Sequence, residues 1–339
     1  MAIRASLLVM TQSDGKQGDS RLVYGGSIPD APGTAAFTMS MPEPSTIPVL
    51  IAVPHAGRAY PHSLFERMRN PGFAAMRLED RYVDKLAERI SVATGAGLLV
   101  AQAPRAMIDL NRACDDVDWD MFARGAPPGA EAGKADSYAP GRRARSGLGL
   151  IPRRLPGIGE LWKRRHDEAD LADRITQIHD PYHACLSQAL AALRERWGAA
   201  LLIDLHSMPP LPRQAGQPPT DFVLGDRFGA SCNGALVAST FAYFSGCGWT
   251  IAHNRPYAGG YVLDRHASPA TGISAMQIEV DRLRYLDSRQ SQPGEGFADI
   301  VHLVIGLVRR LAGEVAELGR MAKLDGAKLD DDGWAQAAE

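Results

Sequence analysis

Cysteine is scarce in this sequence, and the few cysteines are scattered with no CxxC pair. The four cysteines, among 339 residues, are Cys114, Cys185, Cys232 and Cys247. Without a CxxC pair, this spacing favours neither a disulfide framework nor a structural zinc knot. Reduced thiols in a cytoplasmic protein are the simpler interpretation.

Long apolar runs and an excess of basic charge are also missing. No apolar run approaches the roughly 18 residues that span a bilayer, and the N-terminus lacks the pattern of a secretory signal. We therefore expect a soluble, cytoplasmic protein without a membrane partner. The formal net charge is −2, which argues against nucleic acid as a partner. The basic run at 141–145 is interpreted as a solvated loop.

Apolar runs and amphipathic patterns alternate along most of the chain. With 45% hydrophobic and 22% charged residues, the composition is that of an ordinary globular protein. The alternation predicts a single α/β domain with a mixed, mostly parallel central sheet flanked by helices. We expect an irregular leading segment over 1–45, the domain over 46–325 and a polar tail over 326–339. The Gly- and Pro-rich residues 125–159 are expected to form a long loop of the kind used as a lid or binding loop.

Two of the predicted buried strands end in a histidine. The apolar run 199–203 leads into Asp204-Leu205-His206-Ser207, and the run 47–53 leads into His55. Open α/β sheets place ligand sites at strand ends. A catalytic zinc ion takes three protein ligands, mixing His with Asp or Glu, and keeps one position open. A lone histidine at a strand end is more often structural, but two with these flanks favour a zinc site on His55 and His206.

A carboxylate is expected to complete the metal site. Glu79 and Asp80 open the helix that follows the His55 strand, where an acidic residue is equally favoured as a simple helix cap. Asp204 lies two residues before His206 on the same strand face, so it is a candidate for orienting an imidazole from behind the metal ligands.

Further polar residues stand where catalysis would need them. Arg105, Asn111 and Arg112 follow another predicted strand and can clamp a substrate carboxylate or stabilise an oxyanion. A surface ion pair with Asp109 or Asp115 is the alternative for either arginine. Glu279 interrupts an apolar strand, where a carboxylate is costly unless it is paired or functional, so we favour a catalytic role for it.

Five motifs, in this order and spacing, together resemble the N-formylglutamate amidohydrolase family over about residues 45–310. They are Val53-Pro54-His55-Ala56-Gly57, Arg105-Ala106-Met107-Ile108-Asp109-Leu110-Asn111-Arg112, Asp204-Leu205-His206-Ser207-Met208-Pro209, Asn254-Arg255-Pro256-Tyr257-Ala258-Gly259-Gly260 and Gln277-Ile278-Glu279-Val280. That family is similar in turn to the zinc carboxypeptidases, and the resemblance implies a carboxypeptidase-like fold.

The resemblance also implies residue roles. It implies zinc on His55 and His206, substrate or oxyanion contacts from Asn111 and Arg112, and Glu279 as general base and then acid. Carboxypeptidases place a Glu three residues after the first zinc His, where this chain has Arg58 instead.

The carboxylate ligand must therefore come from elsewhere in the chain. In the amidohydrolase family an Asp stands near the start of the following helix, and this matches Asp80 better than Glu79. We predict Asp80 as the third ligand.

The implied reaction is zinc-dependent hydrolysis of a formyl or acyl amide on a small acidic amino acid. For N-formylglutamate the products would be formate and glutamate. Residues expected to hold the substrate carboxylates are Arg58, Arg105, Arg112 and Asn254. Gly259 and Gly260 would let backbone amides approach closely. A carboxypeptidase or peptidoglycan amidase acting through the same site, and a non-catalytic relative that binds a small acidic ligand, are the alternatives; the oligomeric state stays open.

Overall fold

The apolar runs form the centre of one large sheet in the computed structural model, which describes residues 8–12, 20–125, 142–155, 157, 159–212, 216 and 218–336. Within these residues the sheet has nine strands. In order across the sheet they are β1 (Leu8–Gln12), β2 (Ser20–Gly25), β3 (Phe37–Pro42), β5 (Gly97–Ala101), β4 (Val49–Val53), β8 (Ala200–Met208), β11 (Ile273–Asp281), β9 (Phe222–Gly225) and β10 (Ile251–His253). The central strands β5, β4, β8 and β11 are mutually parallel. Antiparallel pairing begins on either side of them, at β3 and at β9.

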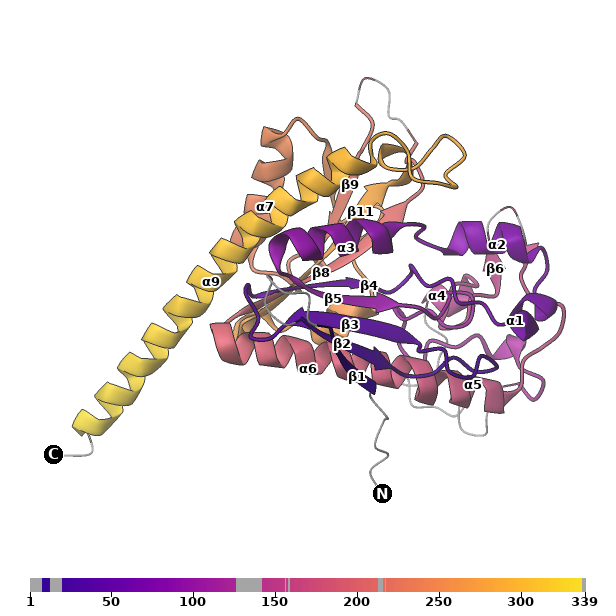
Figure 1. The fold of residues 1–339 in the computed structure, drawn as a ribbon, viewed down its shortest axis with the longest axis horizontal. Helices are drawn as coiled ribbons and strands as arrows, with labels where there is room; N and C mark the ends of the chain where they lie inside the picture. The colour runs from indigo at the N-terminus through magenta and orange to yellow at the C-terminus, as the bar shows by residue number, and fades with distance from the viewer. Residues whose placement is uncertain are drawn as a thin grey trace.

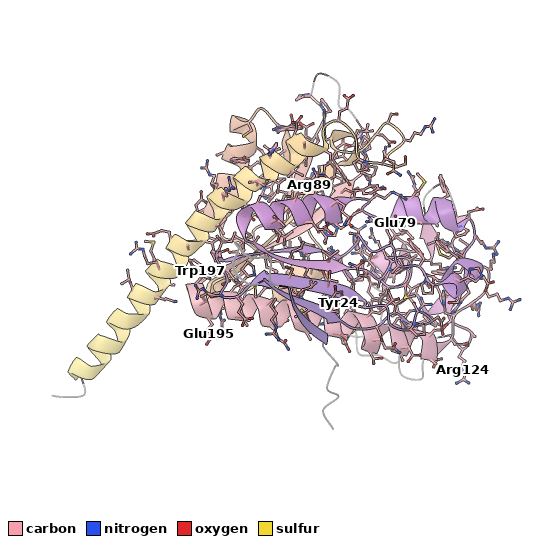
Figure 2. All side chains as sticks on the ribbon, viewed as in Figure 1. Tyr24, Glu79, Arg89, Arg124, Glu195 and Trp197 are labelled. Atoms are coloured by element: carbon pink, nitrogen blue, oxygen red, sulfur yellow. The ribbon has the colours of Figure 1, made fainter. Side chains whose placement is uncertain are left out.

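Helices cover both faces of this sheet (Figure 1). Helices α5 and α6 pack on one face, and α3, α7 and α9 pack on the other. Figure 2 shows Trp197 at the end of α6, where Gly319 of α9 approaches the Trp197 carbonyl so closely that a Cβ would clash. The helices are α1 (His62–Arg67), α2 (Pro71–Leu78), α3 (Val83–Thr94), α4 (Arg142–Arg145), α5 (Glu168–Arg174), the π-helical turn η2 (Ile175–His179), α6 (Asp180–Trp197), α7 (Gly234–Gly246), α8 (Tyr261–His266) and α9 (Phe297–Gln336).

The shorter elements lie in the connections. They are the hairpin β6 (Arg154–Leu155) and β7 (Gly159–Glu160) and the 3₁₀ turns η1 (Trp119–Met121), η3 (Pro269–Thr271) and η4 (Arg282–Arg284). None of the described helices is long and apolar enough to cross a membrane.

Strands β4 and β5 are apolar throughout because they are covered on both faces. In β4, Leu50 and Ala52 join the core under α6, while Val49, Ile51 and Val53 join the core under α3 and α9. Successive side chains of a strand point to opposite faces, so a strand buried on both sides reads as one continuous apolar run. The predicted fold class, a single α/β domain with a mixed sheet that is parallel at its centre, is confirmed.

The leading segment departs from the expectation of irregular structure. Strands β2 and β3 extend the sheet in antiparallel register next to β5. The signal is the alternation of Phe37, Met39 and Met41 with Thr38 and Ser40. Phe37 and Met39 are buried in the core, which is what a strand covered on one face requires.

Two further predicted segments have different boundaries in the structure. Helix α9 runs through the boundary predicted at 325 and continues to Gln336, so the predicted polar tail begins inside a helix. Residues 337–339 lie outside the described residues. Of the predicted loop over 125–159, residues 126–141, 156 and 158 lie outside the described residues, and the described part contains α4 and the β6–β7 hairpin.

The parallel centre of the sheet brings its carboxyl ends to one edge. His55 follows β4, the segment with Arg105 follows β5, and His206 lies near the end of β8. Strands that run in parallel present these ends together, where open α/β sheets form ligand sites.

Candidate active site

Strands β8 and β11 set four polar side chains in two rows. The two strands are parallel neighbours. Asp204 on β8 is the Cα partner of Gln277 on β11, and His206 is the Cα partner of Glu279. Because residues two apart share a strand face, all four side chains lie on the same side of the sheet. The strands thus fix a histidine beside a glutamate without relying on a loop.

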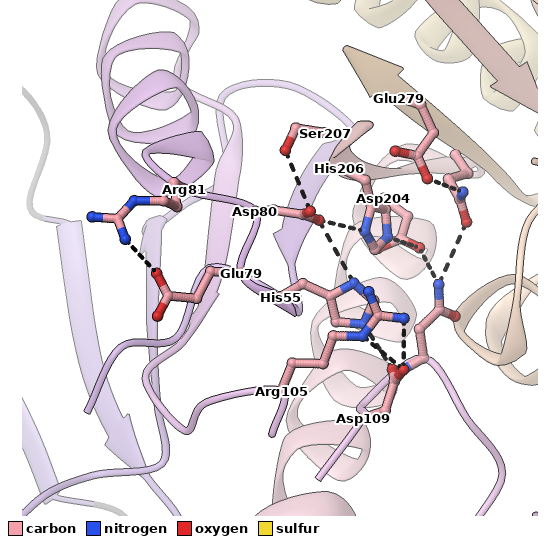
Figure 3. Close-up of polar contacts among 12 residues, drawn as sticks. His55, Glu79, Asp80, Arg81, Arg105, Asp109, Asp204, His206, Ser207 and Glu279 are labelled. Carbon is pink, nitrogen blue, oxygen red and sulfur yellow. Dashed lines mark hydrogen bonds and ion pairs between the residues drawn. The ribbon is translucent and has the colours of Figure 1, made fainter. Parts of the chain in front are cut away.

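His55, Asp80 and His206 converge at the strand ends (Figure 3). All three are at least 96% buried. The Nδ1 atoms of His206 and His55 lie 3.0 Å and 3.6 Å from Asp80 Oδ2. One ligand atom from each residue lies within 4.8 Å of the other two, a grouping that could hold a metal ion.

Asp80, rather than Glu79, faces the two histidines. The Asp80 amide donates to the His55 carbonyl at 2.9 Å, which ties the start of the helical segment to the end of the β4 strand. Asp80 Oδ1 accepts hydrogen bonds from Ser207 Oγ at 3.3 Å and from Arg282 Nη2 at 3.2 Å. Glu79 points away toward Arg81, at 3.4 Å (Figure 3).

Each imidazole has a buried carboxylate behind it. His55 Nε2 lies 2.7 Å from Asp109 Oδ1, and His206 Nε2 lies 2.9 Å from Asp204 Oδ2. The second contact is short but poorly aligned, so His206 Nε2 has no well-aligned hydrogen-bond partner. With a cation between these groups, a proton on each Nε2 would leave each Nδ1 free to coordinate it, which is how carboxylates orient metal-binding histidines.

The charge of this cluster fits a cation. Burial alone would raise the pKa of Asp80, but hydrogen bonds from His206 and His55 hold it well below its usual range. Burial alone would lower the pKa of His206, but Asp204 raises it well above its usual range. The cluster therefore stabilises positive charge between two imidazoles and a carboxylate, and this mixed nitrogen and oxygen donor set is the one that catalytic zinc takes.

Glu279 lies beside the cluster and is the candidate base. It is 6% exposed, and its Oε1 accepts a hydrogen bond from Gln277 Nε2 at 2.8 Å. Burial raises the pKa of Glu279 to about 7, and the nearby Asp80 adds to this while His206 opposes it. A carboxyl group with a pKa near neutrality can both accept and return a proton.

These groups line a cavity of about 230 Å³ that is rich in arginine. Its five arginines are Arg77, Arg105, Arg112, Arg143 and Arg282. Such a small space with many guanidinium groups suits a compact substrate that carries carboxylates.

The arginines of this cavity differ in how far their charge is already paired. Arg105 contacts Asp109 Oδ2 at 2.9 Å. Arg112 is 4.0 Å from the same oxygen and donates to the carbonyls of Asn111 and Leu148 at 2.6 and 2.9 Å. Burial lowers the pKa of Arg112, and like charge on Arg105 and Arg143 adds to this while Asp109 opposes it. A bound carboxylate would relieve this concentration of positive charge.

Two residues expected to contact substrate are not among the cavity-lining residues. Arg58 instead makes two hydrogen bonds to Asp84 in the first turn of α3, at 2.6 and 3.1 Å. Asn254 instead holds Asp226, donating to its carboxylate at 2.7 Å and accepting from its amide at 3.0 Å. Both side chains are occupied by a nearby acidic residue, so the geometry does not support substrate contact.

The glycines expected near substrate do line the cavity. Gly259 has φ +99° and Gly260 approaches Asn111 Oδ1 so closely that a Cβ would displace that side chain. Asn111 Oδ1 also accepts a hydrogen bond from the Val262 amide at 2.9 Å. The absence of side chains at these positions therefore lets the chain before α8 close against Asn111.

Sequence reasoning missed Arg282, Gln277 and Tyr257, all of which line the cavity. Arg282 comes directly after β11, where it donates to Ser207 Oγ at 3.1 Å and to the Glu79 carbonyl at 2.7 Å. Its place at a strand end was a usable signal. Gln277, two residues before Glu279, had the same alternation as a signal, and Tyr257 stands inside the motif at 254–260 that carries the family resemblance.

Comparison with known proteins gives a consistent family. Residues 47–286 match the family model described as N-formylglutamate amidohydrolase. The chain is 27% identical over 283 residues to an N-formylglutamate deformylase of Pseudomonas aeruginosa, covering 81% of this chain and 94% of that protein. It is 29% identical over 250 residues to an N-formylglutamate deformylase of Pseudomonas putida, covering 72% and 84%. Among solved structures, an N-formylglutamate amidohydrolase from Ralstonia eutropha JMP134 is 32% identical with a TM-score of 0.74, covering 83% of this chain and 99% of that one.

Proposed function

The chain belongs to the N-formylglutamate amidohydrolase family, and we propose that it is a zinc-dependent hydrolase that cleaves the formyl amide of N-formyl-L-glutamate. The reaction adds water across the amide carbon–nitrogen bond and yields formate and L-glutamate. Relatives named N-formylglutamate deformylase support this substrate.

One observation carries the proposal. The buried group His55, Asp80 and His206 stands beside Glu279 in a small cavity lined by five arginines. The first three offer a metal site, Glu279 offers a base, and the arginines offer partners for carboxylates. A cavity of about 230 Å³ favours a small amino-acid derivative over the peptides of a carboxypeptidase or peptidoglycan amidase.

His55, Asp80 and His206 would hold the zinc ion, with Asp109 and Asp204 orienting the two imidazoles. When bound there, zinc supplies Lewis acidity toward the amide carbonyl and lowers the pKa of a coordinated water to about 7.

The remaining steps belong to the side chains around the metal site. Glu279 accepts a proton from the attacking water and returns it to the leaving amine nitrogen, because its pKa lies near 7. Arg112 and Asn111 bind the substrate and the charge that develops on its carbonyl oxygen. Arg105 is already paired with Asp109, and its guanidinium adds positive electrostatic potential to the same cavity.

A substrate panel tests the proposal. Zinc-loaded protein is assayed for release of amine from N-formyl-L-glutamate, N-formyl-L-glutamine, N-acetyl-L-glutamate and the dipeptide alanyl-glutamate. We expect N-formyl-L-glutamate to have the highest kcat/KM. Faster cleavage of the dipeptide would assign the site to a peptidase instead, and binding of N-formyl-L-glutamate without any turnover would indicate a non-catalytic relative.

A further inference from the structure

Three buried histidines lie behind the cavity and take no part in the proposed chemistry. His179 ends the π-helical turn before α6, His183 lies one turn further along α6, and His266 ends α8. His179 and His183 are fully buried and His266 is 7% exposed. Among the described residues, the one carboxylate contact that these histidines make is that of His179 Nδ1 with Oδ1 of the exposed Asp180, at 3.5 Å.

His183 and His266 form a hydrogen-bonded chain with one direction. His183 Nε2 lies 3.0 Å from the Leu110 carbonyl oxygen. Because a carbonyl only accepts, this nitrogen must carry the proton, and His183 Nδ1 must accept. It accepts from His266 Nε2 at 2.9 Å, and His266 Nδ1 in turn accepts from Ser187 Oγ at 3.2 Å.

His179 makes the corresponding contact two residues further along the chain. Its Nε2 lies 3.0 Å from the Arg112 carbonyl oxygen, so this imidazole also donates. The π-helical turn Ile175–His179 shifts the helix register between α5 and α6 just where this histidine is placed. Two neighbouring imidazoles, with ring centroids 4.4 Å apart, thus hold the carbonyls of Leu110 and Arg112.

Those two carbonyls enclose Asn111, whose side chain is fixed from the other side. Asn111 Nδ2 faces Asp204 Oδ2 and Gln277 Oε1, each at 3.4 Å. The segment 110–112 is therefore held between the sheet and the histidines, and its only cavity-lining side chains are those of Asn111 and Arg112.

We propose that His179 and His183 are positioning residues that hold segment 110–112 so that Asn111 and Arg112 face the substrate. His266 and Ser187 contribute by keeping His183 in the tautomer that donates to Leu110. The inference rests on the proposed function for what Asn111 and Arg112 bind, but the placement of the segment is a property of the chain itself.

The test compares variants that keep or remove the donor. His183→Gln and His179→Gln retain a side-chain N–H that can reach the carbonyl, whereas His183→Leu and His179→Leu do not. His166→Gln is the matched control, because His166 is equally buried but accepts from Arg67 at 2.9 Å and makes no hydrogen bond to segment 110–112. For each variant we measure KM and kcat for N-formyl-L-glutamate and determine the crystal structure.

We expect each leucine variant to raise KM about ten- to hundredfold, the scale of cost for misplacing a binding group by about 1 Å. Because Arg112 would also stabilise the charge that develops on the carbonyl oxygen, kcat is expected to fall as well. The glutamine variants are expected to recover most of the loss, and His166→Gln to leave KM unchanged. If one leucine variant fails to fold, the other and both glutamine variants still give the comparison.

Three outcomes separate this inference from the proposed function. Unchanged KM in the leucine variants, with segment 110–112 unmoved in their crystal structures, overturns the inference. An equal loss in the glutamine and leucine variants also overturns it, since packing rather than the donor would then matter. If the unmodified protein hydrolyses no N-formyl-L-glutamate, the proposed function fails, and displacement of Arg112 in the leucine crystal structures alone decides the inference.

Discussion

Glu279 and His206 are direct neighbours across the parallel strands β11 and β8. Both side chains rise from the same sheet face, and both are more than 90% buried. A base and a metal ligand placed in this way need no loop closure to meet, because the backbone hydrogen bonds of the sheet fix their separation. The proposed chemistry is therefore built on paired strands of the sheet rather than on loops.

Replacing Glu279 separates proton transfer from metal binding. Glu279→Gln keeps the size of the side chain and an oxygen that can accept the hydrogen bond from Gln277. The amide cannot accept a proton at neutral pH. We expect kcat to fall about 10²- to 10⁴-fold, while the zinc content of the purified protein is unchanged. Steady-state kinetics with metal analysis checks this, and a variant that retains half of the wild-type kcat would remove Glu279 from the mechanism.

The pH dependence follows from the same carboxyl group. Burial raises the pKa of Glu279 to about 7, and only the ionised form can accept a proton. Activity is thus expected to be lost as pH falls through this pKa and to be present above it. A cation on the neighbouring ligands favours the ionised form, so the acid limb of kcat/KM should lie below about pH 7. A profile from pH 5 to pH 9 that is flat, or that rises toward acid, contradicts this role.

The arginines at the cavity predict specificity for a second carboxylate. Arg143 on α4 lines the cavity, and its charge lies close enough to lower the pKa of Arg112. Arg143→Ala is expected to lower kcat/KM for N-formyl-L-glutamate about tenfold, the scale of a charge-assisted hydrogen bond, with much less effect on N-formyl-L-glutamine. Arg145→Ala, in the same short helix but outside the cavity lining, is the matched control. Equal losses on both substrates would show that Arg143 does not read the side-chain carboxylate.

Much of the site was predictable because its signals are local to single strands. His55 and His206 end apolar runs, and Glu279 interrupts one, so each marks a strand end or face without knowledge of the rest of the chain. The parallel order of β4, β8 and β11 then gathers them at one edge. Their placement together agrees with the prediction, while their roles await the experiments above.

What the sequence left open depends on backbone direction and on distant partners. Glu79 and Asp80 are consecutive, and which of them faces His206 is decided by the turn that binds the Asp80 amide to the His55 carbonyl. Arg58 looked like a substrate contact, but Asp84, in the first turn of α3, pairs with it. No spacing rule reveals such a partner, because the pairing depends on how α3 packs against the sheet.

Zinc-dependent hydrolysis is tested by measuring zinc content and cleavage of N-formyl-L-glutamate together, in the wild-type protein and in His206→Ala. We expect about one zinc ion per chain and formate release in the wild type. We expect His206→Ala to lose both, and chelation of the wild type to abolish activity, which added zinc restores. Metal-free wild-type protein that still releases formate from N-formyl-L-glutamate at its full rate would rule out the zinc-dependent mechanism.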